Sequence, residues 1–576
     1  MAKVARPKNE QGRSKKDPPP SVPRIPIWSN VSFHKALQLI ILGAVYSPIS
    51  WLSLTAVYGS LPSALYHNLG KYLSSLIGFL GWKQLRKILP PDIVRWLPAF
   101  AFWIPTLQFS LFKYSSALGP VYGPVITELL TYYPLTLLSL FAAGTFLDEI
   151  DFSGLGSTVA EHGPSVGTYF VFTTIEKIAK SIFLRNIGSN IVVSRIGLQV
   201  IIAIMYALAI PKAVLWPIIP AIAFTMTYNV HNPLQRTTNV LNSTLQLHNF
   251  TLIDRQESIT GYISVLDNSA AHYRVMRCDH SLLGGEWKIP LRKGKRPARA
   301  QEPIYAIFTM LEAVRLVEMN NGQPRRPDPE STALNIGLGI GTAPGALIAH
   351  GINTTIVELD PVVYDFAVKY FGLPSNHTPI IGDAVHLVED AQARNITTKY
   401  DYIIHDVFTG GAEPVDLFTQ EFLSGLKYLL KEDGVIAINY AGDLSLPSAS
   451  HVIRTIFSVF HACRIFREAL PEEAASSEKT EDFTNMVIFC THPSSSGNKP
   501  LTFRQPVLAD FLESGARQQY LFPRPELEIK KEVFEFEGPV LKRGQTKQLE
   551  RWHHRSAVGH WRIMRTVLPD LVWENW

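Results

Sequence analysis

Long uncharged stretches of apolar residues mark the first 230 positions of the chain. Residues 36–61 contain no charged side chain, and this segment exceeds the ~20 residues that a helix needs to cross the ~30 Å hydrocarbon core of a bilayer. Further apolar stretches lie at 96–112, 121–147 and 196–228. Several such stretches together favour a membrane region over the buried core of a soluble protein. We therefore predict a multi-pass α-helical transmembrane region over residues 31–230, with four or five spans.

The charges around this region predict its orientation. Residues 1–30 are polar, basic and proline-bearing, which is typical of a disordered arm. By the positive-inside rule, these basic residues place the N-terminus in the cytosol. Four spans would return the following domain to the cytosol, whereas five would place it in the lumen of an organelle. We expect an integral membrane protein with a cytosolic catalytic domain and leave the organelle open.

After residue 247 the pattern changes to alternating strands and helices. Residues 251–287 hold short alternating apolar runs around turn residues, which predict a β-hairpin module. Residues 304–318 place apolar side chains at helical spacing. The run 333–351 and the strand residues 354–358 then follow the order strand, glycine loop, helix, strand. The sequence thus predicts an α/β Rossmann-like domain of the methyltransferase type over residues 247–495.

A glycine loop and an acid indicate a nucleoside site in this domain. Gly337, Gly339 and Gly341 directly follow an apolar strand, and glycines there let the backbone turn tightly and approach a ligand. Glu358 ends the next strand, about 20 residues further on, where a carboxylate can accept both ribose hydroxyls. A glycine turn without a ligand is the alternative.

Two further carboxylates follow predicted strands. Asp383 comes after the apolar residues 379–381, and Asp406 comes after the strand residues 402–404. The ligand crevice of an open parallel sheet lies at the carboxyl ends of its strands, so both acids should meet Glu358 in one cleft. Each could alternatively only cap the helix after it.

The motifs resemble those of the polyamine aminopropyltransferases, the spermidine and spermine synthases. The resemblance covers residues 251–492 and includes RVMRCDHSLLGG, NIGLGIGTAPG, VELD, IGDA and YDYIIHDVF in family order. It implies that the glycine loop and acids bind decarboxylated S-adenosylmethionine, with Glu358 on the ribose and Asp383 with Ala384 on the adenine. It also implies that Asp406 is the catalytic acid beside the attacking amine of a polyamine.

Besides Ala306-Ile307, which stands in place of the usual His-Glu pair after the helix tyrosine, three positions depart from that family. Ile340 stands where the family loop usually carries an aspartate, Gly261 replaces the glutamine of a Tyr-Gln pair, and Thr409 replaces the second acid of an Asp-Ser-Ser-Asp stretch. Three functions therefore remain open. The first is a membrane-anchored aminopropyltransferase, the second a methyltransferase that uses S-adenosylmethionine, and the third a catalytically silent nucleoside-binding membrane protein.

The composition of the chain limits the classes of partner that we expect. A formal net charge of +5 over 576 residues is too small to indicate nucleic-acid binding. The three cysteines are far apart, so we expect neither a disulfide framework nor a metal site. The expected partners are a polyamine or other amine and the lipid bilayer, with homo-oligomerisation left open. The tail 496–576 ends in a basic stretch rich in tryptophan, which we expect to form a helix that packs onto the catalytic domain.

Overall fold

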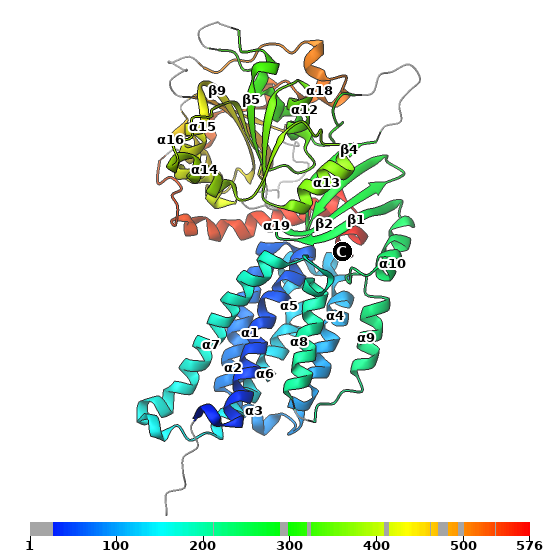
Figure 1. Cartoon of the computed structure of the whole chain (residues 1–576), viewed down its shortest axis with the longest axis vertical. Coiled ribbons are helices and arrows are strands. Elements are labelled where there is room, and N and C mark those ends of the chain that lie inside the picture. Colours follow the sequence, from blue (N-terminus) through cyan, green and yellow to red (C-terminus); the bar gives the residue numbers. More distant parts are fainter. Residues whose placement is uncertain are drawn as a thin grey trace, which may run out of the picture.

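A helical bundle and an α/β domain form the two ends of an elongated molecule, with the C-terminal helices between them (Figure 1). The computed structural model describes residues 27–210, 212–288, 298–319, 324–407, 414–460, 462–470, 482–492, 500–535 and 537–576. Most of the predicted basic arm, up to residue 26, lies outside these residues.

The bundle contains the segment for which we predicted membrane spans. Its helices are α1 (Val31–Tyr58), α2 (Ser60–Leu80), α3 (Trp82–Ile88), α4 (Leu97–Phe112), α5 (Ser115–Leu130), α6 (Tyr132–Asp148), α7 (Ser157–Asn186), α8 (Arg195–Ala209) and α9 (Ile218–Thr227). The uncharged stretch from residue 36 forms most of α1, with Pro48 inside the helix. The apolar stretch 196–228 forms two helices, α8 and α9. The helix α7 is 30 residues long, and we did not predict it because polar positions interrupt its apolar residues.

Within the described residues, two helical stretches are both long and apolar enough to cross a membrane, Val31–Tyr58 and Ser115–Asp148. The other apolar helices of the bundle are shorter, since α4 has 16 residues, α8 has 15 and α9 has 10. The buried core of a soluble protein passes the same test of length and composition, so the multi-pass arrangement stays a prediction.

The bundle has an apolar outer surface and polar groups inside. The helix α2 exposes a row of large apolar side chains, namely Leu65, Leu69, Tyr72, Leu73, Leu76, Ile77 and Leu80. Its buried side chains include instead His67 and Lys71, which are 4% and 3% exposed. A water-soluble helix normally presents the opposite pattern.

A short helix and a four-stranded antiparallel sheet connect the bundle to the α/β domain. The helix is α10 (Gln235–Gln246), and the sheet has the order β1-β2-β3-β4. Its strands are β1 (Phe250–Ser258), β2 (Gly261–Asn268), β3 (Tyr273–Cys278) and β4 (Ser281–Trp287). This sheet confirms the β-hairpin module that the alternating pattern predicted.

The α/β domain is built on a mixed eight-stranded sheet of order β12-β10-β11-β9-β8-β5-β6-β7. The strands β9, β8, β5, β6 and β7 are parallel, and β10, β11 and β12 form an antiparallel edge. Their bounds are β5 (Thr332–Ile336), β6 (Asn353–Glu358), β7 (Thr378–Ile381), β8 (Tyr400–His405), β9 (Leu430–Asp443), β10 (Cys463–Arg467), β11 (Phe483–Thr491) and β12 (Glu528–Ile529). The predicted Rossmann-like domain is thus confirmed.

Helices cover both faces of this sheet because successive strand residues point to opposite sides. Ile403 packs against one set of helices, α14 (Ala384–Ala393), α15 (Gln420–Leu429) and α16 (Pro447–Val459). Its neighbours Tyr402 and Ile404 pack instead against α11 (Ala306–Met310) and α12 (Thr342–Ala349). The remaining helices are α13 (Pro361–Phe371), α18 (Gly515–Tyr520), α19 (Glu550–Val567) and α20 (Asp570–Glu574).

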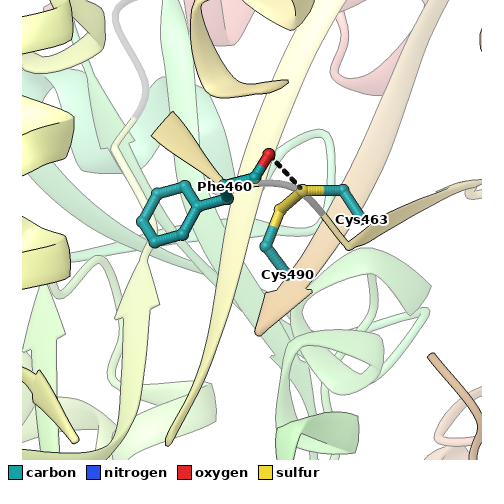
Figure 2. Close-up of a disulfide and its surroundings, with 3 residues drawn as sticks. All are labelled: Phe460, Cys463 and Cys490. Carbon is teal, nitrogen blue, oxygen red and sulfur yellow. Dashed lines mark hydrogen bonds between the residues drawn. A yellow bond between two sulfur atoms is a disulfide. The ribbon is translucent and has the colours of Figure 1, made fainter. Parts of the chain in front are cut away.

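A disulfide joins two of the three cysteines, which corrects the expectation that their spacing leaves them unpaired (Figure 2). Antiparallel pairing of β10 with β11 places Cys463 directly opposite Cys490, with their Cα atoms 4.2 Å apart. A separation of 27 residues along the chain does not reveal this register.

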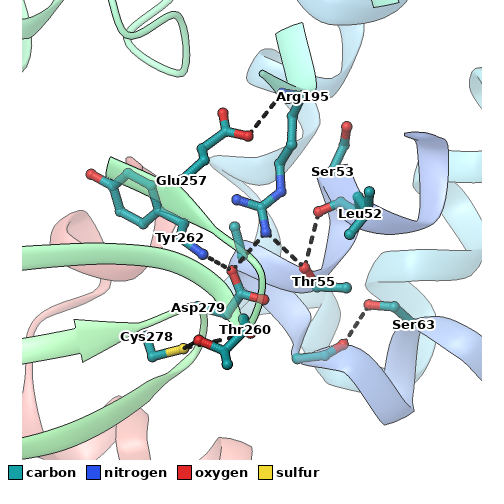
Figure 3. A network of polar contacts seen from close by, with 12 residues as sticks. Leu52, Ser53, Thr55, Ser63, Arg195, Glu257, Thr260, Tyr262, Cys278 and Asp279 are labelled. Carbon is teal, nitrogen blue, oxygen red and sulfur yellow. Dashed lines mark hydrogen bonds and ion pairs between the residues drawn. The ribbon is translucent and has the colours of Figure 1, made fainter. Parts of the chain in front are cut away.

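A buried ionic junction connects the bundle to the four-stranded sheet (Figure 3). The guanidinium of Arg195, at the start of α8, donates to Asp279 at 3.0 Å and to Thr55 of α1 at 3.3 Å. The backbone N–H of Arg195 donates to the Glu257 carboxylate at 2.8 Å. Because Arg195 is only 1% exposed, these partners balance a charge that would be costly to bury alone.

The C-terminal segment packs into the same junction, as predicted for the tail. The Arg277 guanidinium donates to the backbone carbonyls of Val572, Trp573 and Asn575, and also to Ala56 O in α1. The indole N–H of Trp561 in α19 donates to Val57 O at 3.0 Å. The segment that holds α19 and α20 therefore contacts both the bundle and the four-stranded sheet, and α19 also lies beside β11 and α16 of the α/β domain.

Candidate functional site

The glycine loop after β5 is shaped by close backbone contacts. A Cβ on Gly337 would stand 1.9 Å from Asp406 O, and one on Gly339 would stand 2.5 Å from Leu283 O. Both residues also have positive φ values, +81° and +55°. Any side chain at either position would therefore push the loop away from its neighbours. Gly341 then begins α12 as its N-cap residue.

Glu358 ends β6 next to this loop. Its Oε2 accepts the N–H of Leu338 and its Oε1 accepts the N–H of Asp360, both at 2.8 Å. Burial raises the pKa of Glu358 to about 7, although these backbone hydrogen bonds act in the opposite direction. A carboxylate has about four acceptor positions, so roughly two remain for a ligand.

Asp383 follows β7 and caps α14. Its Oδ1 accepts the N–H of Val385 at 2.8 Å, which confirms the capping role, and its side chain is 44% exposed. A Cβ on the preceding Gly382 would meet no heavy atom within 4 Å, so the approach to this strand end is open. Ala384 is the first residue of α14 and is buried. An adenine contact by Asp383 and Ala384 stays a prediction.

Asp406 follows β8 on the other side of the glycine loop. Its N–H donates to Ile336 O at 2.8 Å, and its Oδ1 accepts the side-chain N–H of Asn439 at 2.8 Å. Burial raises the pKa of Asp406 to about 6, and the bond from Asn439 opposes this shift. The carboxylate is thus held as a weak base that titrates near neutral pH.

Strand order brings these groups to one edge of the sheet. The order β8-β5-β6-β7 places Asp406, the glycine loop, Glu358 and Asp383 side by side at the carboxyl ends of four adjacent parallel strands. The backbone hydrogen bond from Gly382 N to Glu358 O, 2.8 Å long, joins two of these ends directly. This is the crevice in which Rossmann-like domains bind their ligands.

The sequence pattern missed Asn439, which lies in the middle of β9. Its amide oxygen is buried without a hydrogen-bond partner among the described residues, while its amide nitrogen holds Asp406. A polar residue inside the otherwise apolar run 435–440 was the available signal. Most buried polar residues satisfy their own hydrogen bonds within the core, so this signal is weak by itself.

Ile340 is a packing residue in the structure. It is 1% exposed and belongs to an apolar cluster with Ile263, Val265 and Met276 of the four-stranded sheet. A Cβ on Gly284 would stand 2.9 Å from the Ile340 side chain. A Cβ on Gly261 would likewise stand 2.7 Å from Cγ of the Asp279 carboxylate. The third departure from the synthase pattern, Thr409, lies outside the described residues.

A parallel sheet with a glycine loop and an acid at the next strand end defines a Rossmann-like transferase of the methyltransferase and spermidine synthase type. Residues 325–474 match the family model described as the spermine/spermidine synthase domain. A polyamine aminopropyltransferase from Vibrio vulnificus is 36% identical over 148 residues, which are 25% of this chain and 48% of the relative.

A second relative matches nearly the whole chain. The N-terminal histidine N-methyltransferase of Emericella nidulans is 50% identical over 547 residues, which cover 93% of this chain and 96% of the relative. The chain belongs to the family of this N-terminal histidine N-methyltransferase. Among solved structures, a probable spermidine synthase from Corynebacterium glutamicum aligns with 46% of this chain and 94% of its own, at 18% identity and a TM-score of 0.32.

Proposed function

We propose that this protein transfers a methyl group from S-adenosylmethionine to a nitrogen atom of an N-terminal histidine in a polypeptide. The observation that carries the proposal is the 50% identity over 93% of the chain, a share that includes most of the helical bundle as well as the α/β domain. The aminopropyltransferase match is restricted to a quarter of the chain. Methyl transfer was our second hypothesis from the sequence, and it now takes the place of the first.

The surroundings of Ile340 argue against aminopropyl transfer. Decarboxylated S-adenosylmethionine carries an ammonium group that needs an anionic partner, and an apolar side chain offers none. Because Ile340 is buried against the four-stranded sheet, it cannot turn aside to expose another partner without opening the core. S-adenosylmethionine carries the same ammonium group, but beside a carboxylate, so its amino-acid end has no net charge and depends less on an anionic side chain. This position therefore favours the ordinary methyl donor.

The strand-end residues fit a nucleoside co-substrate. The acceptor positions left on Glu358 suit the ribose hydroxyls, and the open approach at Gly382 leaves room beside Asp383. When bound, S-adenosylmethionine supplies an electrophilic methyl carbon on a sulfonium centre. Glu358 then orients this ligand, and the glycine loop allows the protein backbone to lie close to it.

Asp406 is the residue that we assign to proton transfer. An imidazole nitrogen attacks through its lone pair, and the methylated ring carries a positive charge until it loses its remaining N–H proton. The carboxylate of Asp406 stabilises this charge and accepts the proton. Asn439 holds one carboxylate oxygen by its hydrogen bond, so that the other is free for the substrate.

We propose further that the bundle spans a membrane. Its apolar outer rows, such as that of α2, suit contact with lipid, and the ionisable side chains of His67, Lys71 and Glu128 are buried inside it. The Cys463–Cys490 disulfide favours an oxidising compartment for the α/β domain. With a cytosolic N-terminus, this requires an odd number of spans and a lumenal active site, the opposite of the side that we expected from the sequence.

The decisive experiment uses the purified full-length chain with S-adenosylmethionine and a peptide that begins with histidine. We expect S-adenosylhomocysteine and a peptide heavier by one methylene unit, with fragmentation placing the gain on residue one. A peptide that begins with alanine is the matched control and should gain nothing. Methylthioadenosine from decarboxylated S-adenosylmethionine and a polyamine, without peptide methylation, would instead establish aminopropyl transfer.

A further inference from the structure

A small polar hollow lies on the side of the bundle. It is formed between α1, α2 and α7, and its lining includes Trp51, Asn68, Glu176 and Lys180. The space open to water inside it is about 30 Å³. This volume holds one or two small polar groups and excludes a nucleotide or a peptide. Its occupant is therefore a small group or the tip of a larger molecule.

In the proposed membrane-spanning bundle, Trp51 at the hollow lies ~4 Å inside the boundary between the lipid head groups and the hydrocarbon core. The 28 residues of α1 span ~42 Å, which leaves ~6 Å beyond each side of a ~30 Å core if the helix is centred. Trp51 precedes the last residue of α1, Tyr58, by seven positions, or ~10 Å. Tryptophan itself is enriched at this boundary.

Glu176 supplies an anionic wall. It accepts Lys71 Nζ at 2.5 Å and Ser47 Oγ at 2.6 Å, and both bonds go to Oε1. Among the described residues no hydrogen bond reaches its Oε2, so this oxygen retains its acceptor capacity. The Glu176 side chain is 14% exposed, and it lines the hollow.

A chain of buried polar groups fixes Glu176 from behind. Ser47 also bonds to His67 Nε2 at 2.9 Å, and His67 Nδ1 lies 2.6 Å from Oε1 of the fully buried Glu128 of α5. The other oxygen of Glu128 is buried without a partner. Two carboxylates, Glu128 and Glu176, thus lie beside the ammonium group of Lys71 and the imidazole of His67, and Glu176 is the carboxylate that reaches the hollow. Its second oxygen can accept a hydrogen bond from a cationic ligand there.

Lys180 provides a cation at the rim. Its Nζ lies 4.4 Å from the centroid of the Trp51 ring, and its side chain is exposed. No ion pair within 4.0 Å joins it to an acid among the described residues. The hollow thus offers a carboxylate oxygen of Glu176 on its wall and the ammonium group of Lys180 at its rim. A ligand that carries one positive and one negative charge matches this pair. Exposed apolar side chains, Leu65 and Leu69 on α2 and Ile178 and Ile182 on α7, provide contacts for acyl chains on the same helices.

We propose that this hollow binds the head group of a phospholipid that carries a primary ammonium group and a phosphate. The ammonium group enters the hollow and donates hydrogen bonds to Glu176 and Asn68, and the phosphate pairs with Lys180 at the rim. A quaternary ammonium group is larger and has no N–H to donate, so it fits less well. This inference rests on the membrane insertion proposed above and is independent of the methyl-transfer chemistry.

The test uses the full-length chain in nanodiscs made from equal parts of phosphatidylethanolamine, phosphatidylcholine and phosphatidylglycerol. After transfer to detergent, mass spectrometry counts the lipids that remain bound. We expect phosphatidylethanolamine to be enriched several-fold over both other lipids. Lys180→Gln should remove the enrichment without disturbing the Lys71–Glu176 ion pair, and Glu176→Gln should remove it as well.

Lys177→Gln is the matched control, because this exposed lysine of α7 has the same charge but does not line the hollow. Equal retention of phosphatidylcholine or phosphatidylglycerol, or an equal loss in Lys177→Gln, would overturn the inference. Extraction of cell membranes with alkaline carbonate tests insertion separately. A chain that stays in the membrane but shows no lipid preference contradicts only the head-group site, whereas a released chain contradicts the membrane proposal itself.

Discussion

The side-chain amide of Asn439 donates a hydrogen bond of 2.8 Å to the carboxylate of Asp406. This contact connects the middle of β9 to the end of β8 and lowers the pKa that burial has raised. The contact gives the proposed base a defined orientation, and together with burial it sets the pKa of Asp406 at about 6.

The Asn439→Ala variant should shift the pH profile of methyl transfer. Asp406 acts in its ionised form, so the rate should fall as the pH drops through about 6 in the unmodified enzyme. Loss of the hydrogen bond destabilises the carboxylate, so its pKa rises and the acidic limb moves to higher pH. The kcat/KM of both proteins is measured across pH with the same peptide. Titration of the peptide then affects both profiles equally, and the difference between them reports on the enzyme. An unchanged limb would show that Asn439 does not act on Asp406.

Substitutions at Glu358 and Asp406 should affect co-substrate binding and turnover separately. Asp406→Asn removes the proton acceptor and should lower kcat by about 10²–10⁴-fold while S-adenosylmethionine still binds. Glu358→Gln should weaken binding of the co-substrate by about 1.5–3 kcal/mol, or roughly 10–150-fold. Calorimetric titration with S-adenosylhomocysteine and single-turnover rates measure the two effects. The assignment fails if Asp406→Asn loses binding and Glu358→Gln keeps it.

Ile340→Asp should destabilise the protein without restoring aminopropyl transfer. A carboxylate at this position would be buried among apolar side chains with no partner, at a cost of about 3–5 kcal/mol. The control Ile340→Val removes one methylene group and should cost about 0.5–1.5 kcal/mol. Thermal unfolding of both variants measures the difference. A stable Ile340→Asp protein that releases methylthioadenosine would show that this position selects the donor.

The side of the membrane on which the α/β domain lies can be read from glycosylation. Asn249, Asn376 and Asn395 are exposed in the structure, and each begins an Asn-X-Thr sequon. If the disulfide reports an oxidising lumen, these asparagines should carry glycans, and endoglycosidase treatment should increase gel mobility. Substituting each Thr by Ala in one triple variant is the control. A chain with no glycan and with free thiols at Cys463 and Cys490 would return the domain to the cytosol.

Much of the α/β domain could be predicted because its signals are local. The glycine loop, Glu358, Asp383 and Asp406 each stand where a strand ends, and parallel strands end at one edge of a sheet. The Cys463–Cys490 pair and the Asn439–Asp406 contact depend instead on which strands lie side by side and in which register. The apolar segment after residue 121 also divides into two helices, α5 and α6. The mean hydropathy of the segment does not reveal this division.

The Arg277 junction makes one side chain common to three separate segments of the chain. Its guanidinium, carried by β3, binds the carbonyls of Val572, Trp573 and Asn575 and the carbonyl of Ala56 in α1. Because a buried cation is costly when its partners are removed, separating any one of these segments from the others would leave this charge short of acceptors. The bundle, the four-stranded sheet and the C-terminal segment are therefore held in one arrangement by a single guanidinium.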